Sequence, residues 1–123
     1  MGKSIRHIFK KKTDYKVSGT LLIECDGERF FGPGRAELLE LIDSTGSISQ
    51  AAKQMRMSYK KAWEMISTLN SQSVNPLVVL KTGGEKGGGS VITSEARELL
   101  KCHKLLRKRF RAFLEKETKQ LNE

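Results

Sequence analysis

Two short amphipathic segments follow one another in the middle of the chain, and a tight break separates them. Residues 48–55 place apolar side chains at i, i+3, i+4 and i+7, and residues 62–69 repeat that spacing. Arg56-Met57 form the break, and Ser58 is well placed to cap the second segment. Two short helices with alanines at their crossing and a tight turn between them are the pattern of a helix-turn-helix.

The flanking residues predict one hairpin on each side of this pattern. Asp26-Gly27 indicates a two-residue hairpin between strands over 17–25 and 28–31, and a helix over 33–44 follows, ended by Gly46. After the helix pair come a strand over 77–81, a glycine-rich tip and a return strand over 90–92. A hairpin directly after the second helix of such a pair occupies the position of a wing.

Thr93 is a good cap for a last helix that continues to about Leu121. The predicted fold class is therefore α+β, mostly α: a winged helix-turn-helix with an N-terminal β-hairpin and a long C-terminal helix. The predicted organisation of the 123 residues is a basic flexible arm over 1–13, a winged helix-turn-helix DNA-binding domain over 14–93 and a dimerisation helix over 94–123.

Charge is sorted along the chain. The net charge is +9: residues 1–16 and residues 93–119 each carry +5, residues 17–92 are balanced at eight basic and eight acidic side chains, and Glu123 contributes the remaining −1. Within that middle part, 24–43 is acidic and 48–69 is basic. Such sorting gives the protein a basic surface, and the most common partner of a basic surface is nucleic acid.

The start of the second short helix is the main candidate for DNA contact. A helix that enters the major groove reads bases with its N-terminal residues, and hydroxyl and ammonium groups suit both base edges and phosphates. The predicted DNA-binding residues are Ser49, Gln50, Ser58, Tyr59, Lys60, Lys61, Lys81 and Lys86. The alternatives are an ordinary helix with a solvated lysine face and, for Lys81 and Lys86, a loose turn. Trp63 is interpreted as a core residue.

A heptad-like apolar seam runs along the last helix. Its members follow a spacing of 4, 3, 4 and 3 and are the predicted dimer interface: Leu99, His103, Leu106, Phe110 and Phe113. A helix of this length has more apolar surface than a small body covers, which favours a two-fold partner. The alternative is that the helix folds back onto the first hairpin of its own subunit. His103 is interpreted as an interface or core residue rather than a ligand.

Nothing in the sequence points to catalysis, a cofactor or a metal. Acidic residues are scattered, no nucleophile motif is present, and Cys25 and Cys102 are interpreted as small apolar fillers. The glycine-rich tip lacks the Lys-Ser/Thr pair and following helix of a phosphate-binding loop. The longest apolar run is the four residues 77–80, which excludes a transmembrane helix. We therefore expect a cytoplasmic protein that is not an enzyme.

Three stretches resemble one known family. They are residues 46–53 (GSISQAAK), 57–63 (MSYKKAW) and the wing 82–89 (TGGEKGGG) with Thr93. Together they resemble the N-terminal DNA-binding domain of ModE-type molybdate-responsive transcriptional regulators, and the first stretch is also similar to LysR-type winged helices. The resemblance covers about residues 17–115. It implies a dimeric regulator on a palindromic operator, with Ser58, Tyr59, Lys60 and Lys61 as recognition-helix contacts and Lys86 at the wing.

Members of that family continue into a pair of small molybdate-binding domains, whereas this sequence ends at Glu123. We therefore expect no such oxyanion site in this chain, and a separate effector-sensing protein is one way in which regulation would work. The predicted function is a sequence-specific, dimeric DNA-binding regulator of molybdate-related genes. Two alternatives are an oxyanion- or metal-responsive binding protein without a DNA role, and a protein–protein adaptor that uses the last helix.

Overall fold

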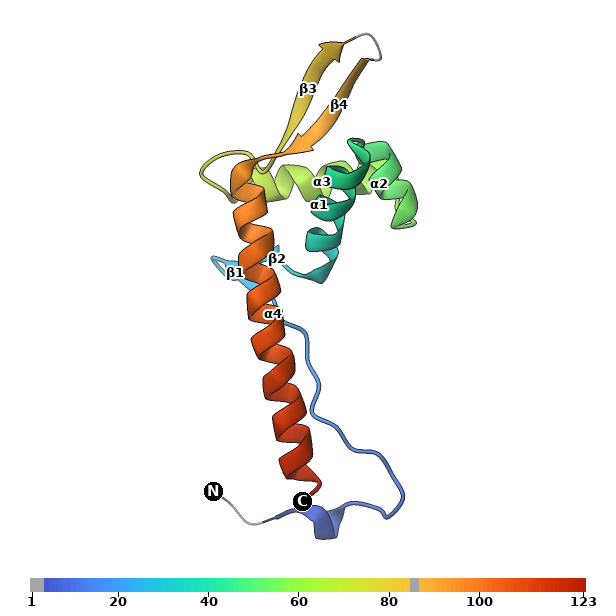
Figure 1. Ribbon diagram of the computed structural model, residues 1–123, viewed down its shortest axis with the longest axis vertical. Coiled ribbons are helices and arrows are strands. Elements are labelled where there is room, and N and C mark those ends of the chain that lie inside the picture. The colour runs from blue at the N-terminus through green and yellow to red at the C-terminus, as the bar shows by residue number, and fades with distance from the viewer. Residues whose placement is uncertain (1–3, 85–86) are drawn as a thin grey trace. The chain divides into compact units, whose positions relative to one another are not determined.

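The computed structural model describes residues 4–84 and 87–123 (Figure 1). Its elements in chain order are a 3-10 helix η1 (Arg6–Ile8), β1 (Ile23–Cys25), β2 (Glu28–Phe31), α1 (Pro33–Thr45), α2 (Ile48–Gln54), α3 (Tyr59–Ser71), β3 (Val78–Gly84), β4 (Gly87–Ile92) and α4 (Ser94–Leu121). Contacts divide the chain into two compact units. We call them the core unit (Leu22–His103) and the tail unit (Met1–Leu21 with Lys104–Glu123).

The core unit is built on three helices, α1, α2 and α3. Pro33 occupies the first turn of α1, where its missing N–H is not needed, and Gly46 ends the helix in the left-handed conformation at φ 70°. Leu38, Leu39 and Ile42 of α1 are fully buried. They pack in one cluster with the apolar faces of the other two helices, whose buried members are Ile48, Ala51, Ala52, Ala62, Ile66 and Leu69. The alanines allow the helices to approach closely.

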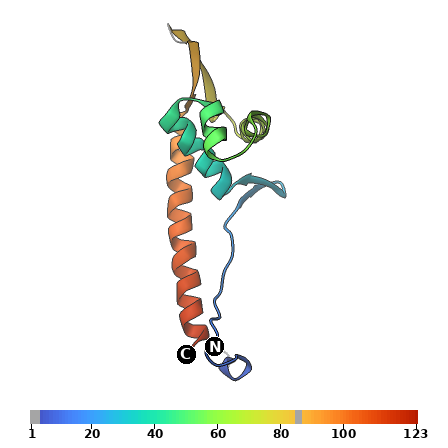
Figure 2. The ribbon, with the colours of Figure 1, turned by 90° about the vertical axis from the view of Figure 1, so that its right-hand side faces the viewer.

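The wing is the antiparallel pair β3–β4, which extends away from the three helices in Figure 2. Val78 pairs with Ile92 at its base, and both side chains are buried. The next pair, Val79 and Val91, is more than one third exposed. Both strands are longer than the sequence predicted, because pairing continues to Gly84 and Gly87.

The first hairpin is shorter than predicted. The sequence predicted a strand over 17–25, but β1 begins only at Ile23, so that prediction is wrong for residues 17–22. Phe31 in β2 is fully buried and joins the helical core. The Arg35 guanidinium of α1 donates to the carbonyl oxygens of Arg29 and Phe30, which fixes the end of β2 beside α1. Burial, and secondarily the nearby Arg29 charge, lowers the pKa of Arg35.

In the tail unit, residues that were predicted as a strand lie along the later turns of α4 instead. The Val17 N–H donates to the Thr118 hydroxyl over 2.8 Å, and the Asn122 side chain donates to the Tyr15 carbonyl over 3.1 Å. Gly19 lies against the ring of Phe110, where a Cβ would stand 3.3 Å from the nearest ring carbon. These contacts give residues 15–19 partners other than a second strand.

The predicted fold class is confirmed: the chain is mostly helical, with two small antiparallel hairpins and a last helix that ends at Leu121 as expected. Among the helices that the structure describes, none has the length and apolar content needed to cross a membrane.

Candidate nucleic-acid interface

The first turn of α3 presents three exposed side chains, those of Tyr59, Lys60 and Lys61. Ser58 is the N-cap, and its hydroxyl oxygen accepts the Lys61 N–H over 3.0 Å. This bond satisfies one of the N–H groups that a helix start leaves without an intrahelical acceptor. The cap therefore fixes where α3 begins, and with it the direction in which the three side chains leave the helix.

The turn between α2 and α3 is closed by backbone hydrogen bonds. The Met57 N–H donates to the Ala52 carbonyl, and the Arg56 N–H donates to the Lys53 carbonyl. This is the Schellman arrangement, in which the residue after the C-cap adopts a left-handed conformation, and here Arg56 does so at φ 56°. These backbone hydrogen bonds fix the conformation of the turn between the two helices.

Tyr59 stands edge-on to Trp63 one turn later, with ring centroids 6.2 Å apart and an interplanar angle of 89°. Trp63 is half-buried against the core cluster, so its predicted core role is confirmed in part. Tyr59 remains 53% exposed. An aromatic side chain that packs edge-on with a neighbouring ring and stays largely exposed suits contact with a nucleic-acid backbone or a base edge.

A hollow of about 350 Å³ lies between the start of α2, the start of α3 and the wing. Three of the predicted DNA-binding residues line it together: Ser49, Tyr59 and Lys81. Leu80, which the sequence analysis did not single out, lines it as well and is 62% exposed. The hollow has hydroxyl, ammonium and apolar groups on its walls, a combination found where proteins contact the grooves of DNA.

The wing is anchored beside α1 by backbone atoms. The Ser90 N–H donates to the Gly46 carbonyl over 2.9 Å, and Ser90 itself is buried. A Cβ added at Gly89 would stand 2.7 Å from the same Gly46 oxygen, so only glycine fits this close approach. In the sequence Gly46 marks a helix end and Gly89 belongs to a glycine-rich tip, and no local signal joins the two residues.

Asn70 near the end of α3 provides the second anchor of the wing. Its side-chain oxygen accepts the Leu77 N–H over 2.8 Å, and its side-chain amide donates to the Val78 carbonyl over 3.2 Å. One side chain thus provides an acceptor for a backbone N–H and a donor for a backbone carbonyl where β3 begins. Asn70 is not predicted from the sequence, because a polar residue late in a helix carries no signal of what it binds.

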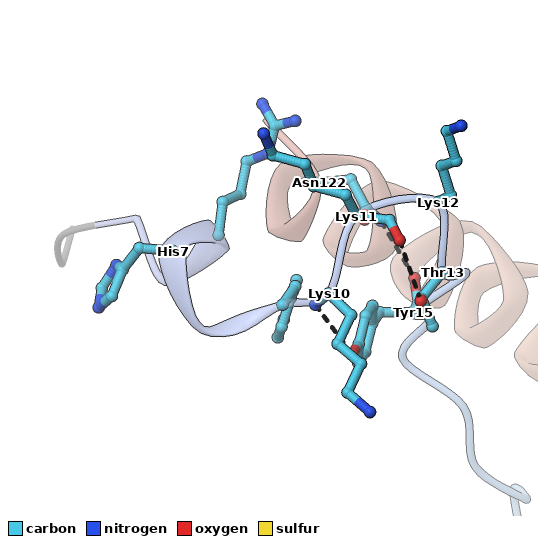
Figure 3. Close-up of a pocket in the computed structure, with 9 residues that line it drawn as sticks. His7, Lys10, Lys11, Lys12, Thr13, Tyr15 and Asn122 are labelled. Atoms are coloured by element: carbon cyan, nitrogen blue, oxygen red, sulfur yellow. Dashed lines mark hydrogen bonds between the residues drawn. The ribbon is translucent and has the colours of Figure 1, made fainter.

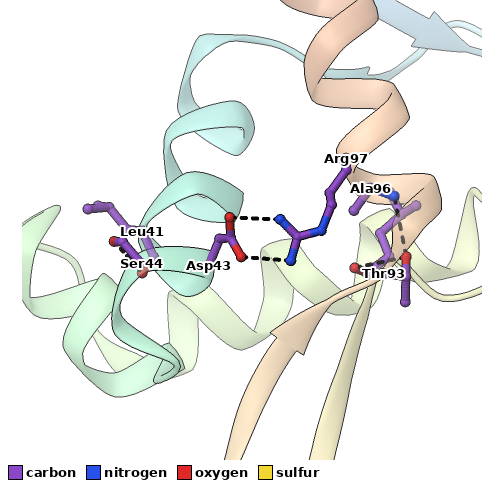
Figure 4. A network of polar contacts seen from close by, with 7 residues as sticks. Leu41, Asp43, Ser44, Thr93, Ala96 and Arg97 are labelled. Atoms are coloured by element: carbon purple, nitrogen blue, oxygen red, sulfur yellow. Dashed lines mark hydrogen bonds and ion pairs between the residues drawn. The ribbon is translucent and has the colours of Figure 1, made fainter.

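The cationic side chains of this surface have no acidic partner. Within residues 4–84 and 87–123 a single ion pair forms, between Arg97 of α4 and Asp43 of α1, with two N–O distances of 3.0 Å (Figure 4). Lys60, Lys61 and Lys81 are exposed and unpaired, so each is available to a phosphate. Arg97 is the exception, because Asp43 holds its guanidinium in a bidentate contact.

The structure places the remaining predicted DNA contacts as follows. Lys60 and Lys61 are exposed on α3 but do not line the hollow. Gln50 is exposed on α2, and its N–H donates to the Ser47 cap. Lys86 lies outside the described residues.

The predicted dimer seam does not form one exposed surface. His103 is 2% exposed and meets Phe31 edge-on, with centroids 5.0 Å apart, and Leu99 packs against the same core. Leu106 and Phe110 are half-buried in the tail unit, whereas Phe113 is 53% exposed. His103 therefore takes the core role that the sequence analysis allowed for it. No cluster of three His, Cys, Asp or Glu side chains that would suit a metal ion is found in the part of the chain that the structure describes.

Comparison with known proteins finds several relatives that carry the same name, ModE. The chain is 42% identical over 86 residues to the transcriptional regulator ModE of Haemophilus influenzae. The aligned region covers 70% of this chain and 34% of the relative. The chain is 39% identical over 89 residues to the molybdenum transport protein ModE of Azotobacter vinelandii, covering 72% and 33%. It is 41% identical over 86 residues to the DNA-binding transcriptional dual regulator ModE of Escherichia coli, covering 70% and 33%. No protein-family model matches the chain.

The chain thus spans about a third of the length of these curated relatives. Identity near 40% over most of this chain indicates common ancestry, and the resemblance inferred from the three sequence stretches is confirmed. The chain is a homologue of the ModE transcriptional regulators over the third of their length that it spans.

Proposed function

We propose that this protein is a sequence-specific transcriptional regulator that binds duplex DNA through the first turn of α3 and the wing. The observation that carries the proposal is the capped, exposed turn Tyr59–Lys61 beside a hollow that Ser49 and Lys81 also line. Two supports of that surface, the turn at Arg56 and the wing anchor at Gly46, are made of backbone hydrogen bonds, and the Asn70 side chain provides a third. A rigid, cationic and partly apolar surface of this kind is what base-specific contact requires.

Molybdate-related gene control is part of the proposal because two of the relatives are named as ModE regulators and a third as a molybdenum transport protein. Footprinting on DNA upstream of molybdate-transport genes, with and without molybdate, tests this part. Protection of a palindromic site is the expected result. Tight uptake of molybdate measured by calorimetry, together with indifference to duplex DNA, would instead support the oxyanion-sensor alternative.

The residues of α3 are tested by a pair of double variants. Lys60→Ala with Lys61→Ala removes two phosphate or base contacts, so we expect weaker operator binding and a slope of log K against log salt that is shallower by about 2. Lys60→Arg with Lys61→Arg keeps both charges, so it should keep the salt slope while changing base preference. Arg29→Gln, which alters an exposed charge on β2, is the neutral control. An unchanged salt slope in the alanine variant would refute the assignment.

Homodimerisation is the second part of the proposal. Leu105 and Phe113 of α4 are 50% and 53% exposed, and together they offer apolar surface to a second copy. Phe113→Glu is expected to shift sedimentation equilibrium toward the monomer, whereas Lys119→Glu on the same helix should not. Because each chain carries a net charge of +9, self-association should strengthen as salt rises while DNA binding weakens. A monomer at every salt concentration would contradict this part.

A further inference from the structure

The net charge of the protein resides entirely in the tail unit. Residues 1–21 and 104–123 contain thirteen basic and four acidic residues, a balance of +9. Residues 22–103 contain ten of each and carry no net charge. The unit that holds the helix-turn-helix is thus neutral, and the long-range attraction to a polyanion comes from a part of the chain that contains neither α3 nor the wing.

The cations in the described part of the tail unit are exposed and unpaired. All twelve Lys and Arg side chains in its described residues are exposed, and none of them forms an ion pair or a side-chain hydrogen bond within those residues. In the hollow lined by Lys10, Lys12 and Tyr15, Figure 3 shows the ends of the two lysines pointing away from each other. Side chains that diverge in this way do not enclose a small anion, but they suit an extended chain of negative charges.

Four of these cations form one face of α4. Lys104, Arg107, Lys108 and Arg111 are spaced so that i, i+3 and i+4 neighbours all carry the same charge, and we call them the basic stripe. Like charges at these spacings destabilise a helix. The opposite side of the same turns carries Leu106 and Phe110, which are half-buried in the tail unit. The stripe is therefore a face that costs stability and forms no ion pair or side-chain hydrogen bond within the described residues.

We propose that the tail unit is a second DNA-binding surface, one that contacts the phosphate backbone of duplex DNA without reading sequence. Duplex DNA carries one negative charge per about 1.7 Å, so several phosphates lie within reach of four cations spread over two turns of helix. An anionic membrane fits less well, because a membrane-surface helix needs a continuous exposed apolar face beside its cations. On α4 the apolar face is covered, apart from Leu105 and Phe113.

In this proposal the two units have different roles in DNA binding. Once the tail unit holds the backbone, the core unit samples nearby sequence at a high local concentration, because the two binding surfaces are on one chain. Non-specific affinity and its salt dependence are then properties of the tail unit, and the preference for one sequence over another is a property of the core unit.

The test uses the full chain and a short duplex that lacks an operator. The stripe variant replaces Lys104, Arg107, Lys108 and Arg111 with Gln, and the matched control exchanges Lys for Arg and Arg for Lys at the same positions. We expect the stripe variant to reduce the slope of log K against log salt by about 3 to 4, whereas the control keeps it. The stripe variant should also melt at a higher temperature than the parent, because repulsion along α4 is relieved, which shows that lost binding is not lost folding.

A second arm separates this proposal from the proposed function. The affinity of the stripe variant is measured for an operator duplex, obtained by selection from random sequences, and for the non-operator duplex. Both affinities should fall by the same factor, so that their ratio is unchanged. The Lys60→Ala, Lys61→Ala variant should instead lower that ratio. If the chain prefers no sequence, the proposed function fails while the non-operator measurement still decides this inference. An unchanged salt slope in the stripe variant, or a loss confined to binding of vesicles that contain phosphatidylglycerol, would overturn it.

Discussion

The core unit and the tail unit are stabilised in different ways. All fifteen buried hydrophobic residues among those described belong to the core unit, from Phe31 to Ala96. The tail unit has no fully buried side chain in its described residues and is joined by a few hydrogen bonds, such as those at Thr118 and Asn122. A surface that distinguishes base sequences must keep its shape, whereas a surface that only attracts phosphates needs charge. The difference in burial therefore matches the roles that we propose for the two units.

The largest expected effect comes from truncating one phenylalanine in each unit. Phe31→Ala removes a fully buried ring from the core unit and should lower the free energy of unfolding by about 3–5 kcal/mol. Phe110→Ala removes a half-buried ring from the tail unit and should cost about 1–2 kcal/mol, because part of that ring already contacts water. Urea unfolding followed by circular dichroism measures both values. Equal losses would break the contrast between the units.

The next effect concerns the wing anchor. Gly89→Ala places a methyl group 2.7 Å from the Gly46 oxygen, so the base of the wing must shift, at a cost of about 1–3 kcal/mol in unfolding free energy. Operator affinity should fall with it, while the salt slope on non-operator DNA stays unchanged. Gly34→Ala in α1 is the control, because a Cβ there meets nothing within 4 Å and alanine favours the helix. A Gly89→Ala variant with normal stability would show that this contact does not position the wing.

A smaller effect is expected from the ion pair within the core unit. Asp43→Asn and Arg97→Gln each break the bidentate contact, and a double-mutant cycle should give a coupling of about 0.2–1 kcal/mol that shrinks as salt is added. Both side chains are more than 40% exposed, which limits the coupling. Thermal denaturation of the four variants at low and high salt is the measurement. A coupling that does not depend on salt would mean that packing, not charge, joins α1 and α4 here.

The smallest expected effect is a gain in the stability of the core unit. Arg56 adopts φ 56°, a region that glycine enters without steric cost, so Arg56→Gly should stabilise the core unit by about 0.5 kcal/mol. Lys53→Gly, in the last turns of α2, is the contrasting substitution and should destabilise by about 1 kcal/mol. Guanidinium denaturation measures the change in unfolding free energy of each variant, and the two changes should have opposite signs. A loss of stability in Arg56→Gly would show that the arginine side chain makes contacts that outweigh its backbone strain.

The sequence predicted the helices well because their signals are local. The apolar spacing of 48–55 and 62–69, the cap at Ser58 and the break at Arg56 all lie within a few residues of the feature they determine. The strand over 17–22 was predicted on the same kind of local signal, and it failed because those residues found partners in α4 about a hundred positions away. Local propensity does not report such a competition.

The candidate site shows the same limit. The exposed residues of α3 followed from helical periodicity, but the contact between Gly46 and Ser90 joins segments that no spacing rule connects. The heptad spacing predicts five side chains on one face of α4, and in the single chain Leu99 and His103 of that set lie in the core whereas Phe113 is exposed. A spacing of 4 and 3 identifies which residues share a face of a helix, but not whether the chain itself covers that face.

The anchor between Gly46 and Ser90 has a consequence for how such a protein diversifies. The Ser90 N–H and the Gly46 carbonyl are both main-chain groups, so this hydrogen bond makes no demand on the exposed side chains of Leu80 and Lys81 in β3. Under the proposed function, substitutions at these two positions change nucleotide preference at little cost in folding stability, so a new target sequence is reachable by a single substitution.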